Sequence, residues 1–218
     1  MLSLGLRQAR DEPLAILCLG AHADDIEIGA GGTILTLLAR HPGSRVQWVV
    51  LSATTQREKE ARESAAAMLR SAGRADVAVH HFEDGFFPSE LPRIKRTFEE
   101  LKPFAPDLIF THHRRDHHQD HRIVSELTWN TFRDHLVLEY EVLKYDPDLG
   151  NPNLFVPLSP EAAAAKVGVI CDCFASQRQR RWFSQETFMA MLHVRGAQAG
   201  SSSGLAEGFY APKCVLHG

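Results

Sequence analysis

Four short apolar runs, each continuous rather than alternating with polar residues, recur along the first half of this 218-residue chain. Continuous runs are typical of strands that are covered on both faces. Segments with helical composition and a glycine or proline stop separate them, and strand followed by helix, repeated, predicts parallel strands joined by right-handed crossovers. We therefore expect an α/β fold, a Rossmann-like open, mostly parallel sheet with helices on both faces. The expected strands are 14–20, 46–52, 77–82 and 107–112, and the expected helices 56–73 and 89–103.

The second half of the chain has a looser pattern. It predicts helices at 121–135, 159–180 and 184–196 and a strand at 136–145. A glycine- and serine-rich stretch at 196–204 predicts a flexible loop rather than a linker, because few residues follow it. The length is ordinary for one core, so residues 1–218 are expected to form a single domain.

Composition excludes several classes of protein. The net charge is −3, and a nucleic-acid partner is not expected because such proteins usually carry a basic excess. No segment has the apolar length of a membrane span, and the stretch at 1–13 has too short an apolar run for a secretory signal, so we expect a cytoplasmic protein. The four cysteines are too few and too unevenly placed for a disulfide framework.

Two polar clusters follow predicted strands. His22, Asp24, Asp25 and Glu27 come directly after the first strand, and five of the twelve histidines lie between residues 112 and 121, after the fourth. In open α/β sheets, ligands bind outside the carboxyl ends of the strands. The two clusters are therefore expected to converge at one edge of the sheet, although they lie far apart in sequence.

These residue types suit a divalent metal. Zinc takes imidazole nitrogen and carboxylate oxygen, and a catalytic site uses three protein ligands and a water. His22 and Asp25, three apart at a turn, can face one ion, and the third ligand is expected among the second cluster: His112, His113, His117, His118 and His121. The absence of cysteine from both clusters indicates a hydrolytic site, in which Asp24 is the candidate general base.

Other residues near the first cluster have simpler explanations. Glu27 comes at the start of the following helix, where the helix dipole favours a negative charge. The glycines at 29–32 lack the spacing of a phosphate-binding loop, so close helix packing is expected there.

Two rival functions stay open at this point. The triplet Asp116-His117-His118 reads as the "DHH" of a two-metal phosphoesterase, although such enzymes need further aspartates from other strands and the sequence offers no convincing second aspartate cluster. A non-catalytic relative that binds a sugar or a metal without turnover is the other alternative.

The motifs at residues 21–34 and 116–121 together resemble a known family. "AHADDIEIGAGGTI" is similar to the "AHPDDxExGxGGT" signature of the LmbE-like, or PIG-L, zinc-dependent N-deacetylases, and "DHHQDH" matches their second motif, "DxHxDH". Softer likeness extends the resemblance over nearly the whole chain, at 57–70, 83–88, 174–177 and 206–210. One departure is Ala23, where the family usually has proline.

The resemblance implies a site and a reaction. It implies that His22, Asp25 and His121 hold one Zn²⁺ per chain, a set that other divalent metals also satisfy, and that Asp24 is the general base. His118 would stabilise the oxyanion or protonate the leaving amine, Asp120 would orient the histidines, and Arg57 would contact the substrate. The implied reaction removes the acetyl group of a small-molecule N-acetylglucosamine-type conjugate and releases acetate and a free amine. Homo-oligomers are usual in the family.

Overall fold

The computed structural model describes residues 12–215. The N-terminal residues 1–11, on which the expectation about a secretory signal mainly depends, lie outside this range. Within it, no helix has both the length and the apolar character needed to cross a membrane. The elements are β1 (Ala15–Gly20), α1 (Asp25–Arg40), β2 (Arg45–Val50), α2 (Thr55–Met68), β3 (Arg74–Val79), α3 (Phe87–Leu101), η1 (Lys102–Phe104), β4 (Leu108–His112), α4 (Gln119–Thr131), β5 (Leu136–Tyr140), β6 (Leu154–Pro157), α5 (Pro160–Cys173), η2 (Ala175–Gln177), α6 (Gln185–Ala199) and β7 (Ala206–Tyr210).

The strands form one seven-stranded sheet in the order β3-β2-β1-β4-β5-β7-β6. The first five strands pair in parallel, whereas β7 runs antiparallel to β5 and β6 antiparallel to β7. The strand order reverses between β1 and β4, which are neighbours in the sheet although two strands separate them in the chain. The predicted open, mostly parallel sheet is confirmed, and its switch point lies where β1 and β4 end.

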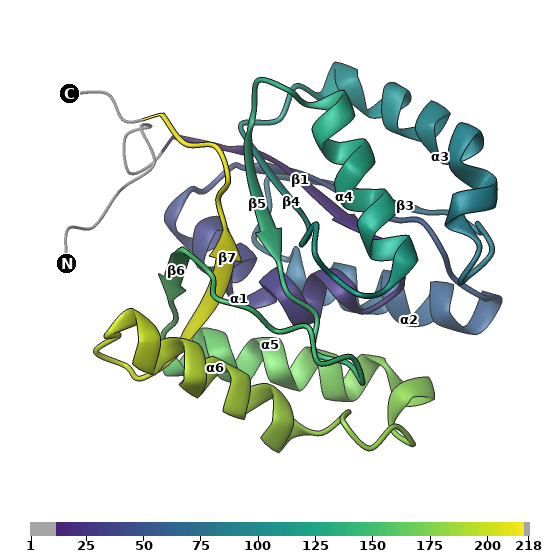
Figure 1. The fold of residues 1–218 in the computed structure, drawn as a ribbon. Coiled ribbons are helices and arrows are strands. Elements are labelled where there is room, and N and C mark those ends of the chain that lie inside the picture. Colours follow the sequence, from purple (N-terminus) through teal and green to yellow (C-terminus); the bar gives the residue numbers. More distant parts are fainter. Residues whose placement is uncertain (1–11, 216–218) are drawn as a thin grey trace.

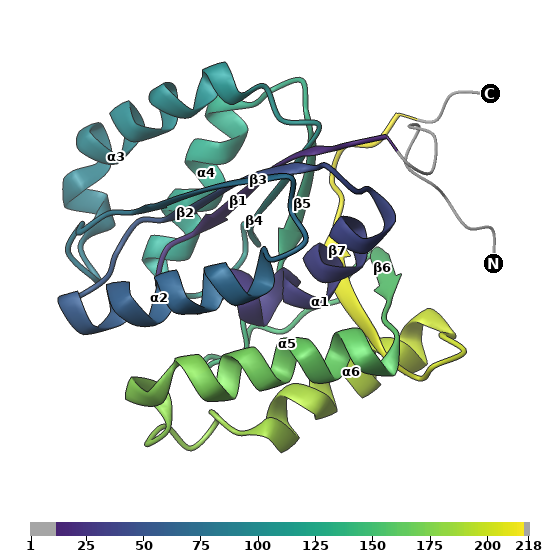
Figure 2. The ribbon, with the colours of Figure 1, turned by 180° about the vertical axis from the view of Figure 1, so that it is seen from behind.

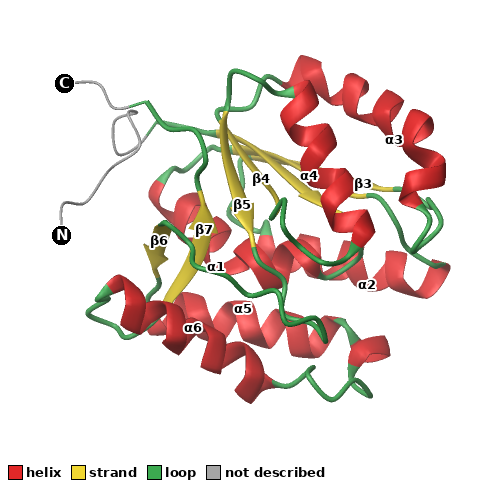
Figure 3. Cartoon of the chain, viewed as in Figure 1, coloured by secondary structure: helices red, strands yellow, loops and turns green. Residues whose placement is uncertain are grey.

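Helices cover both faces of the sheet, as expected. Figures 1 and 2 show α3 and α4 on one face and α1 and α2 on the other, with α5 and α6 forming a further layer beyond α1 and α2. Each face has its own buried apolar cluster: Trp48 and Tyr140 belong to the cluster under α1 and α2, and Phe87 and Phe98 to the one under α3 and α4. Figure 3 shows the loops that join these elements, including the long one between β5 and β6.

Several expected boundaries were wrong for physical reasons. The third strand begins at Arg74 rather than residue 77, because it is an edge strand whose first three residues are exposed and carry no apolar signal. The helix expected at 159–180 ends at Cys173. At the other end of the chain, α6 extends into the predicted flexible loop and stops at Gly200, whose φ of 62° is the left-handed conformation that suits glycine at a helix C-cap.

The glycines of α1 allow close packing, as their sequence context predicted. A Cβ atom on Gly29 would lie 2.1 Å from Cδ2 of Tyr140 on β5, and one on Gly32 would lie 2.4 Å from Cδ1 of Leu158. The backbone of α1 therefore approaches the sheet more closely than a residue with a side chain permits.

The short strand β7, which the sequence did not predict, also holds α1 in place. The buried Glu207 carboxylate of β7 accepts the amide hydrogens of Gly32 and Thr33, and Lys166 of α5 donates to it and to the Ile28 carbonyl. These contacts fix the helix whose first turn carries Asp25.

Candidate functional site

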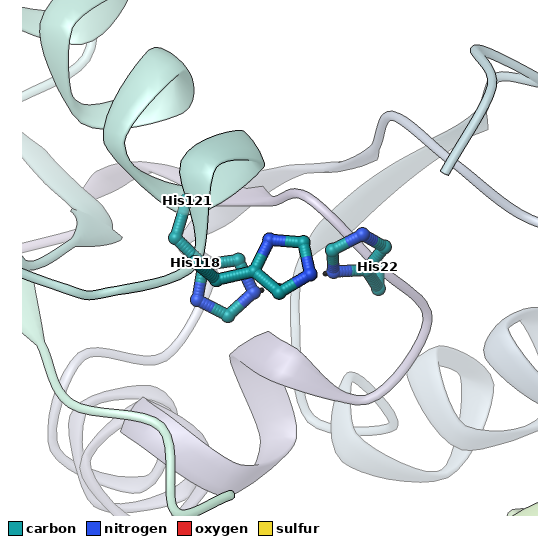
Figure 4. Close-up of side chains that lie close together, drawn as sticks. All are labelled: His22, His118 and His121. Atoms are coloured by element: carbon teal, nitrogen blue, oxygen red, sulfur yellow. Dashed lines mark hydrogen bonds between the residues drawn. The ribbon is translucent and has the colours of Figure 1, made fainter. Parts of the chain in front are cut away.

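Three donor atoms converge where β1 and β4 end. His22 lies in the turn after β1, Asp25 begins α1, and His121 lies in the first turn of α4, as Figure 4 shows for the two histidines. His22 Nδ1 is 3.2 Å from His121 Nε2 and 3.4 Å from Asp25 Oδ2, and His121 Nε2 is 3.6 Å from Asp25 Oδ2. Ligands about 2.0–2.1 Å from a tetrahedral zinc lie about 3.3–3.4 Å apart. The triangle therefore fits a tetrahedral metal ion.

Carboxylates contact the ring nitrogens of His22 and His121 that are not part of the triangle. His121 Nδ1 bonds to Asp116 Oδ2 at 2.9 Å, and His22 Nε2 lies 3.3 Å from Asp120 Oδ2 and 3.0 Å from Asp84 Oδ1. Such partners fix the tautomer and orientation of a metal-binding histidine, so that the other ring nitrogen faces the ion. The sequence singled out Asp120 for this role but not Asp116 or Asp84.

The charges around the triangle favour a cation. Burial alone would lower the pKa of His22, but hydrogen bonds to carboxylates, first that of Asp120, raise it well above its ordinary value. Burial and the neighbouring His112 lower the pKa of His121 to about 4, so this ring is neutral at pH 7 and keeps a lone pair. A bound metal ion would take the place of the proton on His22.

His112 is buried beside the triangle but is already engaged. Its Nε2 accepts the amide hydrogen of Ala21 at 2.9 Å, and its ring stacks on that of His121. Because its lone pair is used, His112 is a support for the turn after β1 rather than a ligand. Its Nδ1 has no hydrogen-bond partner among residues 12–215.

A second donor set overlaps with the first and is weaker. The amides of Gly85 and Phe87 already donate to the two Asp120 oxygens, and the Asp120 amide donates to His118 Nδ1 at 3.3 Å. The Asp84 side chain is 72% exposed. The members of this set are His22, Asp84, His118 and Asp120.

Asp24 lies next to the triangle and is held by Arg57. An Arg57 guanidinium nitrogen donates to Asp24 Oδ1 at 2.7 Å and to the Ala23 carbonyl at 3.2 Å. Burial raises the pKa of Asp24, and the charge of Arg57 opposes that shift. Arg57 thus lies at the site, in contact with the candidate base.

His118 is placed as a hydrogen-bond donor. It is the N-cap of α4, and because its Nδ1 accepts the Asp120 amide hydrogen, the proton of the neutral ring is assigned to Nε2. Burial and the charge of His22 lower the pKa of His118, which keeps the ring neutral. Its ring centroid lies 4.8 Å from that of His22 and 4.7 Å from that of His121, so the three rings drawn in Figure 4 are mutual neighbours.

Glu27 differs from its expected role as a charge at a helix start that the helix dipole favours. It is the third residue of α1, but its side chain is buried and accepts a hydrogen bond from Ser64 of α2. Burial raises its pKa to about 8. The first turn of α1 is buried throughout, from Asp25 to Ile28, and this burial was not readable from the motif alone.

The remaining histidines of the second cluster, His113 and His117, belong to none of the donor sets that the described residues form at the site. His113 bonds to Glu139 and stacks on Tyr210, and His117 is exposed. Both line a hollow of about 620 Å³ that also contains Asp148 but none of the three proposed ligands.

Comparisons with known proteins agree with this architecture. The family model PIG-L, described as GlcNAc-PI de-N-acetylase, matches residues 17–132. An N,N'-diacetylchitobiose deacetylase from Pyrococcus horikoshii is 20% identical, with 89% of this chain and 82% of that one covered and a TM-score of 0.68. The A40926 pseudoaglycone deacetylase is 17% identical, with 93% and 97% covered and a TM-score of 0.73.

A further solved structure with this fold carries a different activity. A 4-carboxy-2-hydroxymuconate hydratase from Pseudomonas putida KT2440 is 18% identical, with 95% of this chain and 98% of that one covered and a TM-score of 0.73. At such identities the likeness shows the fold alone, so the reaction has to be argued from the site.

Proposed function

Because the chain belongs to the PIG-L family, we propose that it is a metal-dependent N-deacetylase. Its substrate is an N-acetylglucosamine-type amino sugar conjugate, and its products are acetate and a free amine. The observation that carries the proposal is the triangle of His22, Asp25 and His121, because it combines metal-ligand spacing with Asp24 and His118 as neighbours.

The donor set suits one Zn²⁺. Two neutral imidazoles and one carboxylate leave a net positive charge on the ion. Asp116 and Asp120, which contact the other ring nitrogens of the two imidazoles, supply the outer-shell contacts that are usual for metal-binding histidines. When bound, zinc would polarise the acetyl carbonyl and acidify a water molecule. His22, Asp25 and His121 are the residues that would hold it.

The chain's own groups then supply the proton transfers. Asp24 accepts a proton from the attacking water and passes it to the leaving nitrogen, while Arg57 holds the carboxylate in place. His118 Nε2–H donates to the oxygen of the tetrahedral intermediate. The bond between the carbonyl carbon and nitrogen breaks, giving acetate and the amine. The remaining guanidinium N–H groups of Arg57 are available to a substrate hydroxyl.

A substrate panel tests the reaction. The zinc-loaded protein is incubated with a range of N-acetylglucosamine conjugates, and primary amine and acetate are measured separately. We expect the two products in equal amounts from at least one conjugate, and neither from chelator-treated protein. Equal amounts are the signature of amide hydrolysis and are not expected from a hydratase.

Other outcomes of the panel favour the rivals. Phosphodiester cleavage that needs two manganese ions, without amine release, would support the two-metal phosphoesterase. Saturable binding of a conjugate by zinc-loaded protein without either product would support a non-catalytic relative.

A further inference from the structure

A largely buried lysine joins the loop that carries the second motif to the segment after β5. Lys144 Nζ lies 3.0 Å from Asp116 Oδ1, on the loop after β4, and 2.5 Å from Asp148 Oδ2 on its own segment. The side chains of Lys144, Asp116 and Asp148 are 11%, 3% and 4% exposed. The more exposed Asp146 lies 4.0 Å from the same ammonium group.

We propose that Lys144 is a positioning residue of the metal centre, which acts through Asp116 on the orientation of His121. The inference rests on the metal site of the proposed function. Lys144 has no part in the family motifs described above, and it lies 23 positions beyond His121 in the chain.

The contacts of Asp116 show how the effect is transmitted. Its Oδ2 faces His121 Nδ1 at 2.9 Å, and its Oδ1 accepts the amide hydrogen of His118 at 2.7 Å and forms an ion pair with Lys144 Nζ at 3.0 Å. Contacts at both oxygens fix the orientation of the Asp116 carboxylate. Because that carboxylate binds Nδ1 of His121, it also fixes the imidazole so that Nε2 faces His22 and Asp25.

Asp148 provides a second carboxylate for Lys144, and we call the contacts of Lys144 with Asp116 and Asp148 the charge clamp. The same Oδ2 that contacts Lys144 accepts the amide hydrogen of His117 at 2.7 Å, so the segment after β5 also binds the backbone of the loop after β4. The ammonium group therefore lies between two buried carboxylates. Without the ammonium group, the carboxylates of Asp116 and Asp148 would repel each other at short range and with little solvent between them. This repulsion would push the loop after β4 and the segment after β5 apart.

Charge, not bulk, is the property that this account requires at position 144. Lys144→Met keeps most of the side-chain volume but removes the charge, and Lys144→Arg keeps the charge. Adding Asp148→Asn to Lys144→Met removes the facing carboxylate and with it the repulsion. Lys95→Met is the matched control, since Lys95 pairs with Glu99 and Thr131 on the α3–α4 side, away from the site.

The experiment measures zinc affinity by competition with a chromophoric chelator, together with thermal unfolding of each metal-free variant. We expect Lys144→Met to weaken zinc binding measurably, but by less than the loss of about 10- to 100-fold that is usual when the outer-shell partner itself is removed, because Asp116 is retained. Lys144→Arg should retain most of the affinity, the double variant should recover part of it, and Lys95→Met should match the wild type.

The outcomes separate this inference from the proposed reaction. Wild-type zinc affinity in a folded Lys144→Met variant would overturn the role of Lys144, whatever the substrate panel shows. An equal loss in Lys144→Met and the double variant would also overturn the charge clamp. A loss of zinc affinity that is rescued in the double variant upholds the clamp, even when no conjugate is hydrolysed.

Discussion

Replacement of Asp24 by asparagine is expected to leave zinc bound and to abolish release of the amine. Asparagine has the same shape and can still accept the hydrogen bond from Arg57, so the local structure should persist. It cannot accept a proton from water, however, and loss of a general base typically lowers the rate by about 10²- to 10⁴-fold. Asp24 is not one of the three proposed ligands, so zinc affinity should change little.

Steady-state kinetics on a conjugate identified by the panel, with zinc affinity measured on the same samples, check this prediction. Asp107→Asn is the matched control: the Asp107 carboxylate accepts the Ala15 amide hydrogen where β1 begins, at the opposite edge of the sheet. That variant should keep wild-type turnover. Full turnover by Asp24→Asn would remove Asp24 as the base.

Replacement of His22 by alanine is expected to abolish both zinc binding and hydrolysis. The change removes one corner of the triangle and also leaves the carboxylates of Asp120 and Asp84 without their shared partner. Only Asp25 and His121 remain of the three proposed ligands, beside several unpaired carboxylates, and this set does not make a tetrahedral zinc site.

The check is metal content after dialysis, followed by the amine assay with added zinc. His193→Ala, which removes an exposed imidazole on α6, should behave as the wild type. Stoichiometric zinc and normal turnover in His22→Ala would show that the ion lies elsewhere. Loss of zinc together with normal unfolding behaviour is the expected result.

The core of the fold was readable from the sequence because its strands are buried on both faces. The continuous apolar runs predicted β1, β2 and β4, and the parallel order followed from the helices between them. The strands β6 and β7 were missed, because β6 has four residues and ends in proline, and a polar residue and a glycine interrupt the apolar pattern of β7. Short strands of this kind take their place from tertiary contacts such as those of Glu207.

The sequence predicted which residues lie at the ends of neighbouring strands, but not the contacts between side chains from different loops. The two motifs placed His22, Asp25 and His121 at neighbouring strand ends, and the structure brings their donor atoms together. The pairing of Asp24 with Arg57 and of Asp116 with Lys144 could not be read in this way. Each joins side chains from different loops, and no spacing rule connects such residues.

The central claim is that one ion lies between His22, Asp25 and His121. Crystals of the zinc-loaded protein, measured at the zinc absorption edge, test it directly. We predict a single anomalous peak about 2.0–2.2 Å from His22 Nδ1, Asp25 Oδ2 and His121 Nε2. A peak beside Asp84 and Asp120 instead, or two peaks about 3.5–4 Å apart as in a two-metal phosphoesterase, would contradict the account.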